Sequence, residues 1–271
     1  MSEGKNEAMK LAVQENLVPG KDFADKLQKI EKYGFEGIEL WGRDGLDEKV
    51  KGIKDAVSVS RVKVSSICSG YPGDLMGAER GVRQGAMEGI KQRLSWAAEL
   101  GATGVIVVPT FGEPKISDLA PLYANVEEVE KKLLIEQCKI LGKHAMDVGS
   151  ILLLEPLNRY ETHLLRKLED AVVICKEVRS DNVKIMADFF HMSIEERNIP
   201  TSIEAAGEFI AHVHLADSTR ELPGYGHTDF KGGFHALRKI GFARYMALEC
   251  SVPGPPDVEL PKCAAYLKKC M

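Results

Sequence analysis

Eight short runs of aliphatic residues recur along this chain, and each is followed by a longer segment in which apolar residues have helical spacing. The runs lie at 10–15, 37–41, 62–67, 104–108, 151–155, 184–188, 212–216 and 245–249. The helical segments lie at 22–33, 47–57, 79–100, 126–148, 163–178, 202–207, 230–240 and 258–269. Eight strands that alternate with helices are what a closed (β/α)8 barrel requires. The sequence therefore predicts the α/β class, with residues 1–271 forming a single TIM-barrel domain.

The endings of several helical segments repeat one pattern, in which a glycine separates the helix from the next strand. The pattern occurs in KYGFEGIEL, ELGATGVIVV, DVGSILLLE and KIGFARYMALE, and glycine suits a helix C-cap that needs a positive φ. A doubly wound open sheet has the same rhythm, so closure into a barrel rests on the number of strands. A dinucleotide-binding sheet of that kind would carry GxGxxG after an early strand, whereas the first strand leads here into QENLVPGKDF.

Composition limits the partners of the protein. A net charge of -4 leaves no basic excess for neutralising phosphates, which disfavours nucleic acid as a partner. The six cysteines form no CxxC pair and follow no secretory leader, so we expect reduced thiols in a cytoplasmic protein. No apolar run approaches the roughly 20 residues that span a bilayer, so no membrane association is expected.

Ionisable residues interrupt the last four apolar runs at or near their carboxyl ends, in ILLLEP, KIMADF, HVHLAD and YMALEC. In a barrel these positions line the mouth, where catalytic groups lie. Side chains alternate across a strand, so each terminal residue shares a face with the residue two positions earlier. If that face points inward, four side chains meet around one quadrant of the mouth: Glu155, Asp188, His214 and Glu249.

Three converging carboxylates would repel one another, and one divalent cation removes that repulsion. An oxygen-rich set with one imidazole favours Mn²⁺, with Mg²⁺ or Co²⁺ as alternatives, over a thiolate-based zinc site. Taken singly, each acid equally fits a helix N-cap or a salt bridge at a strand end. Four such residues in four consecutive strands favour a metal site.

The segment from Leu154 to Glu249 contains EPLNRYET, ADFFHM, HVHLADSTR, PGYGHTDF and ALEC. In these motifs the chain resembles the ketose 3-epimerases related to D-tagatose 3-epimerase, within the xylose-isomerase-like group of TIM barrels. The resemblance implies the metal ligands Glu155, Asp188, His214 and Glu249. It also implies that a ketose binds near its carbonyl end to Glu161, His191 and Arg220. The first half of the chain is less diagnostic, and the loops that select the sugar there include Trp41, 68–71 and 109–113.

A 3-epimerase removes the proton from C3 beside a C2 ketone and returns one on the opposite face. The resemblance implies that Glu155 and Glu249 exchange the roles of base and acid. It also implies that the metal stabilises the enediolate. Arg220 would offset the surplus negative charge of three carboxylates against one dication. The implied partner is a small ketose or related sugar, and we expect a homo-oligomer, either a dimer or a tetramer.

Three other functions compete with this hypothesis. Aldose–ketose or hydroxypyruvate-type isomerisation uses the same enediolate with reprotonation at another carbon. A hydrolase like endonuclease IV needs a histidine-rich site for several zinc ions and a DNA-binding face, whereas this chain has seven histidines, no basic surplus and one complete ligand set. A sugar-binding barrel without activity would not need both glutamates. Among the remaining candidates, His212 shares a face with His214 one layer deeper and is interpreted as a packed barrel histidine.

Overall fold

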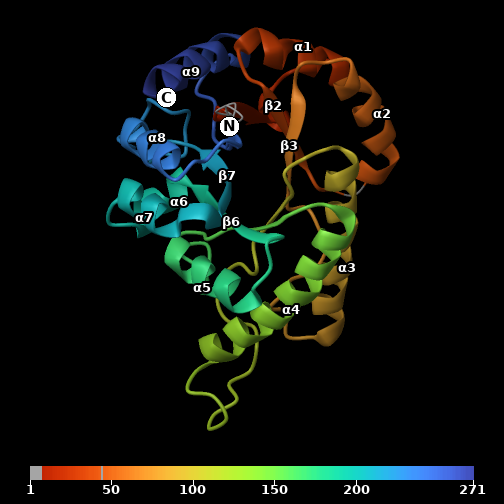
Figure 1. Ribbon diagram of the computed structural model, residues 1–271, viewed down its shortest axis with the longest axis vertical. Helices are drawn as coiled ribbons and strands as arrows, with labels where there is room; N and C mark the ends of the chain where they lie inside the picture. Colours follow the sequence, from red (N-terminus) through yellow and green to blue (C-terminus); the bar gives the residue numbers. More distant parts are fainter. Residues whose placement is uncertain (1–7, 44) are drawn as a thin grey trace, which may run out of the picture.

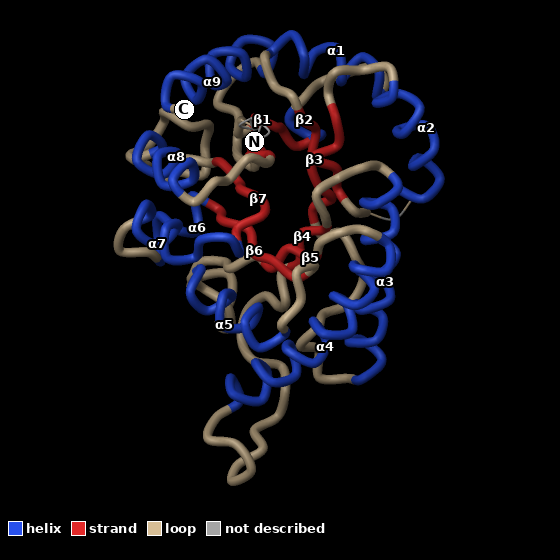
Figure 2. Tube along the Cα trace, viewed as in Figure 1, coloured by secondary structure: helices blue, strands red, loops and turns tan. Residues whose placement is uncertain are grey.

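Eight parallel strands close into a barrel in the order of the sequence, from β1 to β8, and β8 pairs with β1. The computed structural model describes residues 8–43 and 45–271; residues 1–7 and 44 of the predicted domain lie outside the described residues. The strands form the central ring, and the helices surround it (Figure 1, Figure 2). The predicted (β/α)8 barrel is confirmed.

Every strand bound differs from the predicted one by no more than two residues. The strands are β1 Lys10–Gln14, β2 Gly37–Trp41, β3 Lys63–Cys68, β4 Val105–Val107, β5 Leu152–Leu154, β6 Val183–Asp188, β7 Ile210–Leu215 and β8 Tyr245–Leu248. Both faces of the sheet are covered by other parts of the protein, so nearly all strand residues are buried. Continuous aliphatic runs are typical of such strands, and for this reason the strands could be predicted from the sequence.

The helices lie between the strands and after the last one. They are α1 Phe23–Tyr33, α2 Leu46–Ser58, α3 Arg80–Glu99, α4 Val126–Val148, α5 Leu168–Val178, α6 Phe189–Glu195, α7 Ile199–Ala206, α8 Phe230–Lys239 and α9 Pro256–Cys270, with 3-10 turns η1 Glu15–Leu17 and η2 Gly207–Phe209. Gly34 and Gly149 cap α1 and α4 with φ of 91° and 77°. These two caps have the positive φ that the glycine pattern predicted.

α5 and α6 differ most from the predicted helical segments, and α7 begins at Ile199 rather than at residue 202. α5 begins at Leu168 rather than at residue 163, because the preceding residues make tertiary contacts in place of helical hydrogen bonds. His163 Nδ1 lies 2.7 Å from the Gly112 carbonyl, and the amide of Leu157 donates to the Leu165 carbonyl. The short helix α6 was not predicted. It starts directly after β6, so no loop residues mark its beginning.

The hydrophobic core has two parts. The larger part fills the space between the sheet and the helices. A smaller cluster lies inside the barrel, formed by Cys68, Ile106, Leu153, Met186 and Ala211. Leu153 and Met186 therefore point inward, so the alternation of side chains also directs Glu155 and Asp188 to the inside of the barrel. This interior cluster supports a layer of polar side chains at the carboxyl ends of the strands.

Because the strands of the closed barrel are parallel, the loops after the strands lie at one end of it. The loop between β4 and α4 projects beyond the ring of helices (Figure 2). The isolated bridge between Gly112 and Thr162 joins this loop to the one that follows β5. Among the helices of the described part of the chain, none combines the length and apolar character needed to cross a bilayer.

Candidate metal centre and active site

The four predicted metal ligands meet at the carboxyl ends of adjacent strands. Glu155 directly follows β5, Asp188 ends β6, His214 lies in β7 and Glu249 directly follows β8. One potential ligand atom from each residue lies within 4.8 Å of those of the other three. The structure therefore brings together all four residues that the strand-end pattern selected.

His214 lies at the centre of this group and is fully buried. Its Nδ1 is 3.3 Å from Glu249 Oε2 and 3.7 Å from Glu155 Oε1. The same atom is 3.8 Å from Asp188 Oδ2. These separations exceed a good hydrogen bond. One imidazole nitrogen thus faces three carboxylates around a common point.

The two oxygens of Asp188 have different surroundings. Oδ1 accepts hydrogen bonds from the backbone amides of Phe190 and His191 and caps α6. Oδ2 is buried and has no hydrogen-bond partner among the described residues, and the same holds for His214 Nδ1. Such orphaned atoms are rare in protein interiors. Asp188 therefore combines the N-cap role with a free oxygen, and this donor set fits a hard divalent cation.

Burial and neighbouring charges shift the pKa values of the side chains in this group. Burial raises the pKa of Glu155. Burial alone would raise the pKa of Glu249 as well, but His214 outweighs it and lowers that pKa. Burial alone would lower the pKa of His214, yet Glu39 and Glu249 hold it well above its ordinary value. A ligating nitrogen must be free of its proton, so a divalent ion in this group would compete with a proton for His214.

His191 lies in α6, one turn after Asp188, and is buried. Its Nδ1 accepts a hydrogen bond from the backbone amide of Asn158 at 3.1 Å. A nitrogen that accepts from an amide carries no hydrogen, so in the neutral ring the hydrogen is on Nε2. This Nε2 lies 3.7 Å from Asp188 Oδ2. His191 therefore presents an N–H donor toward the ligand group.

Arg220 approaches the ligand group from the loop after β7. One guanidinium nitrogen lies 3.3 Å from Glu249 Oε2, and the other lies 3.5 Å from Glu161 Oε1. The guanidinium also packs over the Phe190 ring, 4.6 Å from its centroid. Glu161 accepts from the Asn158 side chain at 2.9 Å and is about one-third exposed. The three predicted sugar-binding residues thus lie together beside the predicted ligands.

The backbone of Arg220 is held in the left-handed region, with φ of 57°. For a residue other than glycine this conformation costs on the order of 1–3 kcal/mol. The surrounding loop enforces it: the amide of Arg220 donates to the Asp217 carbonyl, and the amide of Ser251 donates to the Arg220 carbonyl. The Asp217 carboxylate accepts from the amides of Ser218, Gly224 and Thr228. The loop therefore directs the guanidinium toward Glu249.

The buried polar residues of the barrel interior that the sequence analysis missed include Gln14 and Glu39. Glu39 lies two residues before the end of β2 in GIELW. A charged residue within an aliphatic strand is the signal that selected Glu155, and the same signal could have identified Glu39.

His212 is fully buried and hydrogen-bonded to Glu39 and Ser66, in keeping with a packed barrel histidine. Trp41 packs on the interior cluster at the mouth, where its indole N–H donates to Asn16.

The family model described as "Xylose isomerase-like TIM barrel" matches residues 27–270. The chain belongs to this family. It is 29% identical over 242 residues to the 3-dehydro-D-guloside 4-epimerase of Escherichia coli K12, covering 89% of this chain and 92% of that protein. It is 30% identical over 223 residues to the ketose 3-epimerase of Arthrobacter globiformis, covering 80% of this chain and 73% of that protein.

Among solved structures, the apo form of 3-keto-D-glucoside 4-epimerase from E. coli superposes with a TM-score of 0.88 at 28% identity, covering 97% of this chain and 100% of that one. These relatives of the xylose isomerase-like family are sugar epimerases. The predicted membership in the xylose-isomerase-like group is therefore confirmed, and the predicted isomerase class agrees with the relatives.

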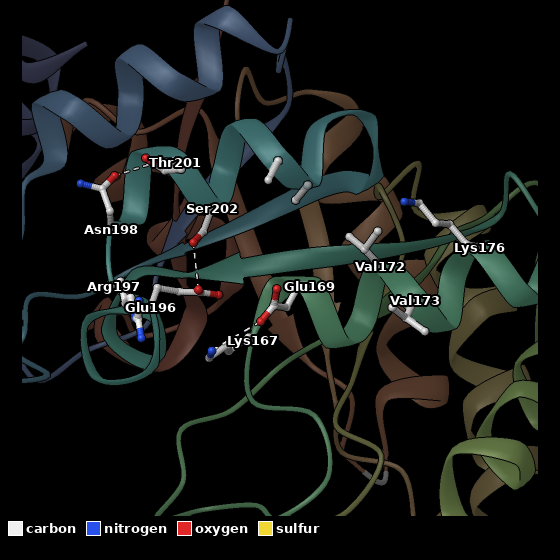
Figure 3. Close-up of a pocket in the computed structure, with 12 residues that line it drawn as sticks. Lys167, Glu169, Val172, Val173, Lys176, Glu196, Arg197, Asn198, Thr201 and Ser202 are labelled. Atoms are coloured by element: carbon white, nitrogen blue, oxygen red, sulfur yellow. Dashed lines mark hydrogen bonds and ion pairs between the residues drawn. The ribbon is translucent and has the colours of Figure 1, made fainter. Parts of the chain in front are cut away.

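A groove of about 510 Å³ lies between α5 and α7, and none of the predicted site residues lines it. Several of its polar groups are paired with one another (Figure 3). Glu196 accepts from the Leu168 amide and the Ser202 hydroxyl, and Lys167 lies 3.4 Å from Glu169. None of the buried polar atoms without a hydrogen-bond partner among the described residues belongs to the lining of this groove, whereas two of them lie in the ligand group at the barrel mouth.

Proposed function

We propose that this protein is a metal-dependent sugar epimerase that inverts a carbon next to a ketone. The observation that carries the proposal is that Glu155, Glu249, Asp188 and His214 converge at the barrel mouth. Two of their buried potential ligand atoms, Asp188 Oδ2 and His214 Nδ1, have no hydrogen-bond partner among the described residues. Glu155, Asp188, His214 and Glu249 would hold one divalent ion. We propose Mn²⁺ as that ion, with Mg²⁺ or Co²⁺ as alternatives. Such an ion acts as a Lewis acid that makes the carbon–hydrogen bond beside a carbonyl more acidic.

The two glutamates supply the proton transfers. One carboxylate removes the proton from the carbon beside the ketone, and the electron pair of that bond moves toward the carbonyl oxygen. The other, in its protonated form, returns a proton on the opposite face, so the carbon is inverted and no atom is lost. Glu249 is well placed to transfer a proton, because the side-chain amide of Gln14 donates a hydrogen bond to its Oε1 at 2.9 Å and fixes the carboxylate. Its Oε2 is left toward His214 and Arg220.

Three residues would bind and orient the sugar. His191 offers an N–H group, Arg220 offers a planar pair of donors, and Glu161 accepts from sugar hydroxyl groups. Arg220 also offsets part of the negative charge of the carboxylates. Residues 1–271 would form one domain, and two or four chains would assemble in the cytoplasm.

The carbon that is inverted defines two candidate reactions. The ketose 3-epimerase motifs favour C3 of a free 2-ketose. The relative aligned over 92% of its length is named a 4-epimerase of a 3-dehydro-guloside, which favours C4 of a 3-keto-glycoside as the second candidate. Both reactions remove a proton from the carbon next to a ketone, so the same carboxylate pair serves either one.

The test is to incubate the Mn²⁺-loaded protein in deuterated water with a panel of 2-ketoses and 3-keto-glycosides. Proton NMR then reports deuterium at C3 or C4 together with the epimeric product. We expect inversion with deuterium uptake in one of the two classes. Absence of exchange in both panels from a protein that holds stoichiometric metal would contradict the proposed function. Formation of an aldose from one of the 2-ketoses would support isomerisation instead.

Replacing Arg220 with alanine is expected to reduce kcat/KM by about 10- to 100-fold, because hydrogen bonds to charged groups contribute about 1.5–3 kcal/mol. The thermal midpoint should change little, since the side chain lies at the mouth and not in the core. The matched control is Arg159→Ala, which removes an arginine paired with Glu195 in the loop after β5. Equal kinetic effects of the two substitutions would exclude a specific role for Arg220.

A further inference from the structure

Glu39 is a fully buried carboxylate inside the barrel, and its hydrogen-bond partners among the described residues are Gln14, Ser66, His212 and His214. One oxygen accepts from Gln14 at 3.0 Å and lies 2.8 Å from His214 Nε2. The other accepts from Ser66 at 2.6 Å and lies 2.8 Å from His212 Nε2. A buried carboxylate is costly unless its oxygens are satisfied. Here four hydrogen-bond partners surround it.

The backbone contributes to this placement. The register between β2 and β3 shifts between Ile38 and Glu39, so that Ile38 pairs with Val64 while Glu39 pairs with Ser66. Such a bulge changes the direction of a side chain, and bulges are common near active sites. The shift leaves Ser66 opposite Glu39, where its hydroxyl donates to the carboxylate.

The two ring nitrogens of His214 have distinct roles in this arrangement. Nε2 faces Glu39, and a carboxylate in that position requires a hydrogen on Nε2. Nδ1 faces Glu155, Asp188 and Glu249 and has no hydrogen-bond partner among the described residues. A carboxylate that accepts from one nitrogen of a histidine fixes both the tautomer and the orientation of the ring for metal binding by the other nitrogen.

Gln14 extends this arrangement to a second ligand. Its amide nitrogen donates to Glu39 Oε1 at 3.0 Å and to Glu249 Oε1 at 2.9 Å. Both hydrogens of the amide are used, so the side chain has no freedom to rotate without losing a bond to a carboxylate. Through this single amide, the position of Glu249 depends on the position of Glu39.

We propose that Glu39 is a positioning residue of the metal centre. It holds His214 with Nδ1 directed at the metal, and through Gln14 it aligns the carboxylate of Glu249. This inference rests on the proposed metal-dependent function. The competing interpretation is that Glu39 only satisfies polar groups in the barrel core. A third arrangement is a metal bound between Glu39, Cys68 and His214, whose potential ligand atoms also lie within 4.8 Å of one another.

The test compares Glu39→Gln with Glu130→Gln. Glu130 is a matched control because it is also fully buried and lies 2.5 Å from a histidine nitrogen, that of His163, but belongs to α4 in the helical layer. The readout is the dissociation constant of Mn²⁺, measured by electron paramagnetic resonance of the free ion, with folding checked by circular dichroism. We expect Glu39→Gln to weaken Mn²⁺ binding by about 10- to 100-fold. Glu130→Gln should leave binding within about threefold of wild type, since that carboxylate touches no proposed ligand.

Unchanged Mn²⁺ affinity in a folded Glu39→Gln protein, or an equal loss in both variants, would overturn the positioning role. Failure of the wild-type protein to bind Mn²⁺ would instead overturn the proposed metal centre, and this inference with it. If Glu39→Gln does not fold, nitrogen NMR of the wild-type protein, labelled at histidine and loaded with diamagnetic Zn²⁺, decides the question. We expect His214 to bind through Nδ1 and to carry its hydrogen on Nε2. Binding through Nε2 would support the site between Glu39 and Cys68.

Discussion

Replacing Asp188 with asparagine is expected to weaken Mn²⁺ binding by more than about 100-fold and to abolish measurable epimerisation. Loss of a group that only orients a ligand already costs about 10- to 100-fold in metal affinity, and removal of a ligand charge should cost more. The fold should survive, because the asparagine oxygen can still cap α6 in the way that Asp188 Oδ1 does through Phe190 and His191. The substitution therefore separates the ligand role of this residue from its structural role.

Calorimetric titration with Mn²⁺ measures the effect, and the thermal midpoint without metal reports the integrity of the fold. The matched control is Asp229→Asn, since Asp229 caps α8 in the same manner through the amide of Gly232. The control should bind Mn²⁺ normally. Full metal occupancy and activity in the Asp188 variant would remove this residue from the ligand set.

Substitution of Glu155 or Glu249 with glutamine should produce an asymmetric defect. Each glutamate is proposed to face one side of the reacting carbon, so each epimer depends on its own base. In either variant the remaining carboxylate can remove the proton only from the epimer that presents it on that side. The same group would then return the proton to the face from which it came. Net epimerisation should fall by about 10²- to 10⁴-fold, the usual contribution of general acid–base catalysis.

The experiment uses deuterated water, both pure epimers of a confirmed substrate, and proton NMR. The unmodified enzyme should exchange and invert. Each variant, once its metal content has been verified, should introduce deuterium into one epimer without inverting it, and the two variants should select opposite epimers. Near-normal epimerisation by both would contradict the two-carboxylate mechanism. The same conclusion would follow if neither variant exchanges despite full metal occupancy.

The regular parts of the fold could be predicted because their signals are local. A strand of a parallel barrel is buried on both faces and therefore consists of a short aliphatic run. That pattern predicted both limits of β2, and those of β8 to within one residue. Alternation of side chains along a strand then directed Glu155 to the same side as Leu153. For these reasons the sequence was sufficient to select Glu155, Asp188, His214 and Glu249 as one group.

The remaining parts depend on distances across the barrel that no local pattern encodes. The contact between Gln14 and Glu249 joins residues 235 positions apart, and the one between Glu39 and His214 joins residues 175 positions apart. Closure of the barrel pairs β1 with β8, and the register shift between Ile38 and Glu39 places Glu39 opposite Ser66 of β3. The sequence by itself thus determined the barrel and the four candidate ligands. Only the tertiary structure decided which buried groups hold those ligands in place, because hydrogen bonds require proximity and direction that appear only once the sheet has closed.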